Sequence, residues 1–385
     1  MKSRMIYVVG HVTQGFGAVQ ALQNHLAREA MTFCVIEHPL FVERAWTTAA
    51  YHSTYRRYVK GREVAQRRGP CVLRPQALRY LKDVLYTVWC GFREPECIDL
   101  FIGINNLNAL SGLCLKWLGR VRRVVFYTVD YARTARFATP ALNAIYRWVD
   151  RLGVWGADEV WNVSDRIRHE RQRIARDPRK LRLVPNTVDL AQIPDVAQAV
   201  RVPGRLIFVG GLMRESGLDE VIEALPAIQR QIPSVTLTII GGGPSEAALR
   251  ELVTAHGLQS MVCFLGYRPY GEALHEIAQA CVGLSPYAPT APEAPYLYYC
   301  DPSKVKAYLA CGCPIVIYDL PEVARTVAQA GAGIVYRTRD ALVAAIVALL
   351  RDERVLAQYR ANALQLAAQF DQTRVFQRAL ASVAA

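Results

Sequence analysis

Short apolar runs alternate with segments of helical period along almost the whole chain. This alternation is typical of β-α-β units, which place their strands in a parallel sheet and cover the sheet with helices. A chain of 385 residues is long enough for two such domains, each with its own hydrophobic core. The sequence therefore predicts an α/β fold made of two tandem doubly wound, Rossmann-like domains.

The expected elements divide almost evenly between the two halves of the chain. Strands are predicted near 4–9, 32–37, 98–103, 122–129, 158–163 and 181–184, and then near 205–210, 235–240, 261–265, 281–285, 314–318 and 333–336. Helices are predicted at 17–29, 75–90, 107–118, 139–152 and 164–175, and then at 217–230, 245–256, 271–280, 303–311, 321–330 and 339–350. The Tyr- and Arg-rich span 41–74 has little apolar period and is interpreted as a loop or lid.

The periodicity lapses around 187–204, where Pro194, Pro203 and Gly204 interrupt a polar stretch. We therefore expect an N-terminal domain at 1–198, a C-terminal domain at 199–365, and a last helix at 366–385 that returns to the N-terminal domain. Ligands of doubly wound domains bind outside the carboxyl ends of the strands. Two facing domains would then share a cleft.

The ten cysteines fall mostly inside apolar runs, and no two of them have the spacing of a zinc knuckle or a redox motif. They are interpreted as reduced thiols of the core, and no metal site is expected. The apolar run after the basic N-terminus is too short for a signal peptide, and no run reaches the length of a membrane span. The sequence predicts a cytoplasmic protein.

The positive charge is concentrated in the first half. Residues 1–200 contain 30 Lys and Arg against 17 Asp and Glu, which accounts for the whole net charge of +13, and all six tryptophans lie there as well. This asymmetry predicts an anionic partner. The residues that could rest on anionic lipid headgroups are Arg56, Arg57, Lys60, Arg62, Arg67, Arg68 and the stretch 146–155. A solvated surface is the alternative, and no motif that reads nucleic acid accompanies the charge.

Polar or glycine residues follow several first-half strands, at the functional end of the predicted sheet. The turn after the first strand contains His11, Gly15 and Gly17, although its spacing matches neither the dinucleotide fingerprint nor the P-loop. Asn105, Asn106 and Asp130 follow later strands. Asp130 is either a helix cap or a substrate contact, and Ser164 is interpreted as an ordinary helix cap.

The second half carries three glycine turns after strands and one well-specified helix. The residues of interest in the turns are Gly211, Arg214, Gly242, Gly243 and Tyr267. In the helix, Asp301 is expected to cap the N-terminus, Ser303 to follow it, and Gly312 to close the C-terminus. Lys304 lies near the helix N-terminus, where the dipole favours anions, so a bound anion would explain it.

These segments resemble, in order and spacing, the group 1 (family 4) glycosyltransferases of the GT-B fold. The resemblance rests on Val209-Gly210-Gly211-Leu212, Gly217-Leu218-Asp219, Gly241-Gly242-Gly243-Pro244, Phe264-Leu265-Gly266-Tyr267, Leu284-Ser285-Pro286 and Pro302 to Val316, with 157–164 and 184–189 in the first half. It implies transfer of a sugar from a nucleotide-sugar, with retained configuration, the donor on the second domain and the acceptor on the first. It also implies no metal, and no Asp-x-Asp occurs in the chain.

The resemblance assigns roles to the candidate residues. Donor contacts are expected from Gly15, Gly17, Gly211, Arg214, Gly242, Gly243, Tyr267, Asp301, Ser303 and Lys304. Acceptor contacts are expected from His11, Asn105, Asn106 and Asp130, and the catalytic residues from Asp130 and Lys304. The leaving diphosphate takes the acceptor's proton in the usual proposal for the family, so electrostatic stabilisation of that diphosphate is the main contribution of the protein.

The chain departs from the family pattern at the donor clamp. The family's Arg and Lys fall on Gly211 and Ser216, and its glutamate pair falls on Tyr299 and Ala307. Arg214 and Lys304 are candidates to supply the lost positive charge, and Asp301 to replace a carboxylate.

Two other functions therefore stay open: a non-catalytic GT-B module that binds a sugar nucleotide or supports a partner enzyme, and a GT-B epimerase. The leading expectation is a transferase acting on an anionic acceptor, lipid-linked or part of a cell-surface glycan, at the inner membrane face.

Overall fold

The computed structural model describes residues 4–12, 17–40, 52–71, 76–131, 133, 137, 139–288 and 295–384, and these form two compact units. The first unit comprises Met1–Asn186 and Gln372–Ala385, and the second comprises Thr187–Asp371. The sequence placed the boundary at 198/199 and the returning helix at 366. In the structure the boundary lies after Asn186 instead, because Val188 forms a β-bridge with Asp371 and therefore belongs to the second unit.

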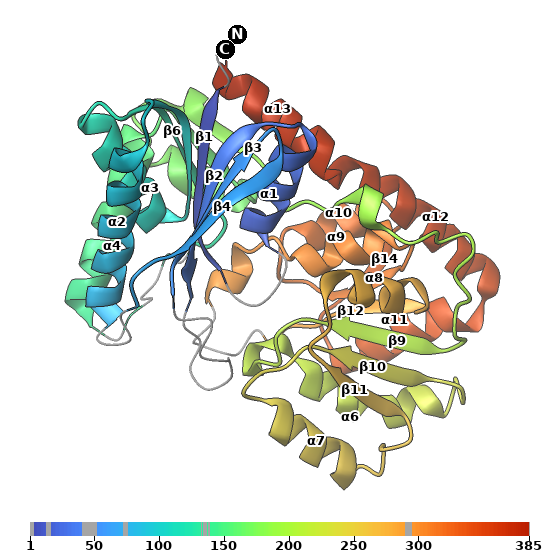
Figure 1. Cartoon of the computed structure of the whole chain (residues 1–385). Coiled ribbons are helices and arrows are strands. Elements are labelled where there is room, and N and C mark those ends of the chain that lie inside the picture. The colour runs from blue at the N-terminus through green and yellow to red at the C-terminus, as the bar shows by residue number, and fades with distance from the viewer. Residues whose placement is uncertain are drawn as a thin grey trace. The chain divides into compact units, whose positions relative to one another are not determined.

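An eight-stranded sheet in the order β4-β3-β2-β1-β5-β6-β7-β8 forms the centre of the first unit (Figure 1). Its strands are β1 (Met5–Val12), β2 (Thr32–Pro39), β3 (Thr54–Val59), β4 (Arg62–Arg68), β5 (Ile98–Ile104), β6 (Val121–Thr128), β7 (Glu159–Asn162) and β8 (Leu181–Leu183). The helices are α1 (Ala18–Arg28), α2 (Gln76–Arg93), α3 (Asn106–Trp117), α4 (Pro140–Gly156), α5 (Asp165–Gln172) and α13 (Gln372–Ala384). In sheet order, the six strands β2-β1-β5-β6-β7-β8 are parallel. The central strands are almost wholly apolar because helices cover both faces of the sheet.

The second unit is a six-stranded parallel sheet in the order β11-β10-β9-β12-β13-β14, the strand order of a doubly wound domain. Its strands are β9 (Arg205–Val209), β10 (Thr236–Ile240), β11 (Val262–Gly266), β12 (Val282–Ser285), β13 (Ile315–Tyr318) and β14 (Gly333–Tyr336). Its helices are α6 (Leu218–Gln229), α7 (Glu246–Ala255), α8 (Tyr270–Ala278), α9 (Ser303–Ala310), α10 (Val323–Gln329), α11 (Arg339–Arg351) and α12 (Glu353–Ala367). Leu206 and Phe208 pack into one core layer and Ile207 into the other, since alternate side chains of a strand face opposite sides. The expected α/β fold with two Rossmann-like domains is confirmed.

The interpretation of 41–74 as a loop was wrong for 54–68, which forms the antiparallel hairpin of β3 and β4 at the edge of the first sheet. Lys60 and Gly61 turn the hairpin with φ of 49° and 74°, the backbone of a tight two-residue hairpin turn. Tyr58 faces inward and stacks on Phe33 at 4.5 Å between ring centroids. Residues 41–51 and 72–75 lie outside the described residues.

Gly61→Ala is expected to destabilise the first unit by about 3 kcal/mol, because a Cβ there would lie 2.0 Å from the carbonyl oxygen of Ala27 in addition to the positive φ. Gly119→Ala is the matched control. Gly119 has a φ of 71° but nothing within 4 Å of the added carbon, so backbone strain alone should cost about 1 kcal/mol. Urea denaturation of both variants measures the difference, and equal losses would contradict the steric argument.

Some of the cysteines expected in the core are exposed, and some of the basic side chains expected to meet an anionic partner are paired within the protein. All ten cysteines are free thiols, and Cys34, Cys90, Cys281, Cys311 and Cys313 are buried, but Cys71 and Cys263 are exposed. Arg56 and Arg57 form ion pairs with Glu37 and Glu94, so these two arginines have carboxylate partners within the first unit. Within the described ranges, no helix is both long and apolar enough to cross a bilayer.

Candidate functional site

Lys304 lies in the first turn of α9, beside the carboxyl end of β9. Its Nζ is 4.2 Å from the ring centroid of Phe208 and 5.6 Å from that of Tyr287. Burial lowers the pKa of Lys304 to about 8. No carboxylate among the described residues pairs with this amine, although buried charges are normally paired. The environment is therefore suited to a bound anion that would neutralise the charge of the Lys304 ammonium.

The glycine turns after β9 and β10 pack against each other through their backbones. A Cβ on Gly241 would lie 1.9 Å from the carbonyl oxygen of Gly210, and one on Gly243 would lie 2.4 Å from that of Leu212. These two glycines are thus required by chain packing. Gly211 and Gly242 differ, since a Cβ on either would meet no atom closer than 3.6 Å. Gly211 and Gly242 therefore border the open space where a ligand can approach.

The same turns bring Lys304 to the glycine backbone. A Cβ on Gly210 would lie 3.4 Å from Nζ of Lys304, and the φ of Gly210 is 152°. An amine at this place is held beside backbone groups at the carboxyl end of a central strand, where doubly wound domains bind their ligands. The amine and the backbone of the glycine turn therefore lie side by side at this edge of the sheet.

Asp301 does not cap α9, so that interpretation was wrong. The residue before the helix is Pro302, and Asp301 instead forms an ion pair with Lys306, whose side chain is fully buried. A buried ammonium needs a counterion, and Asp301 supplies it. Gly312 closes the helix with a φ of 58°, as expected.

The remaining candidates of the second unit are open to solvent. Arg214 begins a short 3₁₀ helix (Arg214–Ser216) and is exposed, as are Tyr267, which follows β11, and Ser303, the first residue of α9. Ser216, at the position of the family's lysine, is buried and donates a hydrogen bond to the carbonyl of Met213 at 2.6 Å. Its hydroxyl therefore secures the turn.

Asn105 positions the chain at Asp130 in the first unit. The Oδ1 of Asn105 accepts hydrogen bonds from the backbone N–H groups of Val129 and Asp130, each at 3.1 Å. Asn105 has a φ of 66°, and such strained backbone gathers at functional sites. Asp130 follows β6 and is half-buried, at the carboxyl end of the sheet.

His11 is held by two partners that sequence reasoning missed. Its Nδ1 lies 3.0 Å from the amide nitrogen of Asn108, which can only donate, so Nδ1 accepts and Nε2 carries the proton. That Nε2 lies 3.2 Å from Oδ2 of Asp83 on α2. His11 therefore has both ring nitrogens engaged within the protein. Neither partner could be found from sequence spacing, because both come from helices distant in the chain.

A buried polar cluster extends from this contact. His38 contacts Ser53, Thr87 and Asp83 through its two ring nitrogens, and Lys82 pairs with Asp83. Burial lowers the pKa of His38 to about 4. Burial alone would raise the pKa of Asp83, but hydrogen bonds from His11 and His38 outweigh it and hold that pKa far below its usual range.

Other first-half candidates have structural partners. Asn106 is buried, donates to the carbonyl of Tyr146 at 3.2 Å and accepts from the N–H of Leu107, so it holds α3 to α4. Gly17 precedes α1, and its N–H donates to Oε1 of Gln20. Ser164 caps α5 as expected. Gly15 lies outside the described residues.

Comparisons with known proteins agree on one family for the second unit. Residues 198–366 match the family described as "Glycosyl transferases group 1". The chain is 31% identical over 201 residues to a glycogen synthase of Mycobacterium tuberculosis, a match covering 50% of this chain and 45% of that protein. It is 29% identical over 155 residues to a GDP-mannose-dependent alpha-(1-6)-phosphatidylinositol monomannoside mannosyltransferase of Mycolicibacterium smegmatis, covering 39% of each. The chain thus spans less than half the length of these curated relatives.

Solved structures share the fold across nearly the whole chain. Sucrose-phosphate synthase from Thermosynechococcus elongatus superposes with a TM-score of 0.73 at 16% identity, covering 98% of this chain and 100% of that one. Anabaena HepE in complex with UDP-glucose superposes with a TM-score of 0.70 at 17% identity, covering 99% of each chain. Residues 198–366 thus match the group 1 glycosyl transferases, and the chain has the fold of the GT-B glycosyltransferases.

Proposed function

We propose that this protein transfers a sugar from a nucleotide-sugar to an anionic acceptor, lipid-linked or part of a cell-surface glycan, with retention of anomeric configuration. The observation that carries the proposal is Lys304, a cation without a carboxylate partner among the described residues, placed beside the glycine turns of the group 1 domain. Its amine would neutralise the donor diphosphate as negative charge develops on the leaving group.

The other donor contacts follow from the same surroundings. Gly211 and Gly242 leave room for the phosphates, and Arg214 is an exposed guanidinium after the β9 turn. Bidentate pairing of a guanidinium with phosphate would compensate for the glycine and serine at the family's clamp positions. HepE structures contain UDP and UDP-glucose, which makes UDP the first nucleotide to test.

On the first unit, we assign the acceptor to Asp130. Asn105 holds the backbone at this carboxylate, while His11 and Asn106 are committed to protein partners. Asp130 would hydrogen bond the acceptor hydroxyl and orient it. The excess of 30 basic over 17 acidic residues in 1–200 supports an anionic acceptor for this unit.

A thermal-shift panel of UDP, GDP and ADP, followed by donor hydrolysis, tests the function. A nucleotide at 100 times its Kd stabilises the protein by about 2.7 kcal/mol, a shift of several degrees. Asp130→Asn should keep this shift and lose sugar transfer, and the anomeric configuration of the product, read by NMR, tests retention. Nucleotide binding with neither hydrolysis nor transfer would favour the non-catalytic module, and no shift with any nucleotide would refute the proposal.

A further inference from the structure

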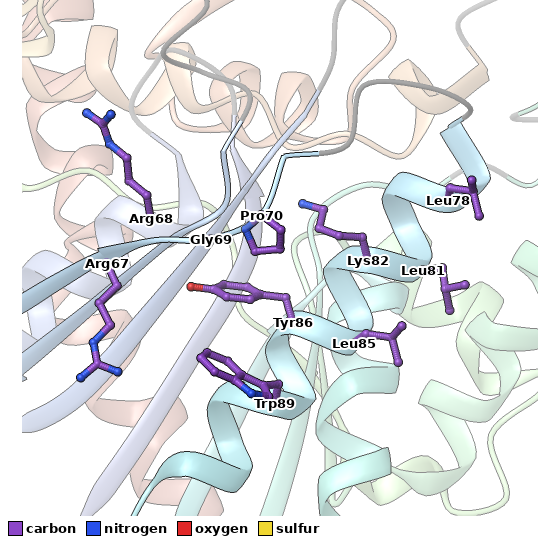
Figure 2. Close-up of a pocket in the computed structure, with 10 residues that line it drawn as sticks. All are labelled: Arg67, Arg68, Gly69, Pro70, Leu78, Leu81, Lys82, Leu85, Tyr86 and Trp89. Atoms are coloured by element: carbon purple, nitrogen blue, oxygen red, sulfur yellow. The ribbon is translucent and has the colours of Figure 1, made fainter.

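Helix α2 carries its apolar face toward solvent. Its large apolar side chains at Leu78, Leu81, Leu85, Trp89 and Phe92, here called the outer face of α2, are 45–59% exposed. Their spacing of three or four residues places them on one side of the helix. Figure 2 shows Leu78, Leu81 and Leu85 projecting together from α2.

The inner side of the same helix carries buried polar residues beside apolar ones such as Tyr86 and Cys90. Arg79, Asp83 and Thr87 are buried, and Asp83 and Thr87 contact His38 of β2. The buried side of α2 is thus partly polar while large apolar side chains are exposed, whereas the apolar side of a surface helix in a globular protein ordinarily faces the core. A contiguous exposed apolar face of this kind marks an interaction surface.

A pocket of about 650 Å³ continues the outer face of α2 toward the end of β4. Tyr86 and Trp89 turn toward Gly69 and Pro70, and Tyr86 packs so closely that a Cβ on Gly69 would lie 2.6 Å from its ring (Figure 2). The lining is mainly apolar and opens to solvent. It adds concave apolar area to the helix face.

Guanidinium groups border this apolar surface. Arg67 and Arg68 line the pocket, and the guanidinium of Arg93 lies 4.6 Å from the ring centroid of Trp89. None of the three forms an ion pair with a described residue. Leucines and tryptophan side by side with such guanidinium groups match a bilayer surface, where acyl chains lie beneath anionic headgroups.

Helix α4 presents side chains of the same kind. Ile145 and Trp148 on α4 are 58% and 59% exposed. Phe137 connects the two helices, because its ring centroid lies 6.5 Å from that of Tyr80 on α2 and 5.9 Å from that of Tyr146 on α4. The apolar surface is thus not confined to one helix of the first unit.

We propose that the outer face of α2, with Arg67, Arg68 and Arg93, docks the protein on a bilayer that contains anionic phospholipid. The proposal rests on the proposed function only in that a lipid-linked acceptor gives the docking its purpose. The charge argues against a second copy of the chain as the occupant, since two such faces would bring like charges together. Helix α2 would lie parallel to the bilayer plane, with its leucines at the level of the upper acyl chains.

Flotation of the full chain with vesicles tests the docking. Wild-type protein should float with phosphatidylcholine vesicles containing 30% phosphatidylglycerol, and its binding should fall at least tenfold in 0.5 M salt or on pure phosphatidylcholine. Leu81→Glu/Leu85→Glu places two carboxylates at exposed positions, so it should fold normally and lose at least tenfold in binding. Arg67→Gln/Arg68→Gln should lose about 30-fold.

The control variant Val200→Glu/Leu364→Glu adds the same two charges at exposed apolar positions of the second unit and should bind vesicles like the wild type. The proposal fails if wild-type protein ignores anionic vesicles, if the α2 variants float unchanged, or if they alter only self-association or capture of a protein partner. The UDP-induced thermal shift separates this result from the proposed function. Wild-type protein that shows the UDP-induced shift but does not float refutes docking alone, and wild-type protein that floats but shows no shift refutes only the nucleotide site.

Discussion

Lys304→Met is expected to make the free protein more stable while removing the stabilisation that a nucleoside diphosphate provides. A cation held largely out of water without a carboxylate partner among the described residues destabilises the folded state, and methionine fills a similar volume without charge. The pKa of about 8, against an ordinary 10.5, corresponds to about 1–2 kcal/mol after allowance for the partial exposure of Lys304. Donor affinity and turnover should fall by about 100-fold.

The pKa of Lys304 also predicts how stability and nucleotide affinity change with pH. Between pH 8 and 10.5 the unfolded chain binds the Lys304 proton and the folded protein releases it, so wild-type stability rises with pH across that window. The stability advantage of Lys304→Met should therefore shrink above pH 8. Nucleotide affinity of the wild type should decrease over the same range, because the neutral amine does not attract phosphate.

Urea denaturation and nucleotide titration at pH 7, 8 and 9 measure both effects. Arg230→Met removes an exposed cation just after α6 and is the matched control, which should leave nucleotide affinity unchanged. If Lys304→Met binds the nucleotide as tightly as the wild type does, the donor phosphates bind elsewhere.

The first unit is expected to lose stability between pH 6.5 and 4, chiefly through His38. The unfolded histidine binds a proton near pH 6.5, whereas the buried one does so only near pH 4. In this window the unfolded chain binds more protons, so unfolding becomes easier as pH falls. The shift corresponds to about 3 kcal/mol, and Asp83, whose folded pKa is depressed, adds a further loss below its unfolded pKa of about 4.

His38→Gln should flatten this acid dependence by about 3 kcal/mol, because glutamine does not titrate. It is expected to be less stable than the wild type at pH 7, where it replaces hydrogen bonds to Ser53 and Thr87. His256→Gln, at an exposed position of the second unit, is the control. Denaturation at pH 7.5, 5.5 and 4.5 gives the slopes, and an unchanged slope in His38→Gln would place the titrating group elsewhere.

Periodicity was sufficient to predict the two parallel sheets, because a buried parallel strand needs a continuous apolar run and a helix must follow it. It was insufficient for β3 and β4. The inward Tyr55 and Tyr58 of β3 are separated by two arginines, and a bulge between Arg57 and Tyr58 breaks the alternation. The Lys60-Gly61 turn was the available cue.

The site was less predictable than the fold because its side chains are selected by contacts between distant segments. An apolar stripe on α2 would ordinarily be assigned to the core, and only the structure shows that Asp83 faces inward to His11 and His38. The position of Asp301 suggested a helix cap, but its carboxylate instead forms an ion pair with the buried Lys306. Lys304 stood out from the sequence because its charge opposes the helix dipole, an argument that needs no partner.

The first unit is built from both ends of the described chain, so it cannot be completed during synthesis until its last segment has been made. Helix α13 belongs to that unit: Phe376 is buried beside His25, and Ser382 donates a hydrogen bond to Glu159 at 2.9 Å. Those residues follow the whole of the second unit in the chain. On the ribosome, the surface of residues 1–186 that α13 covers therefore stays open until the whole second unit and then α13 have emerged.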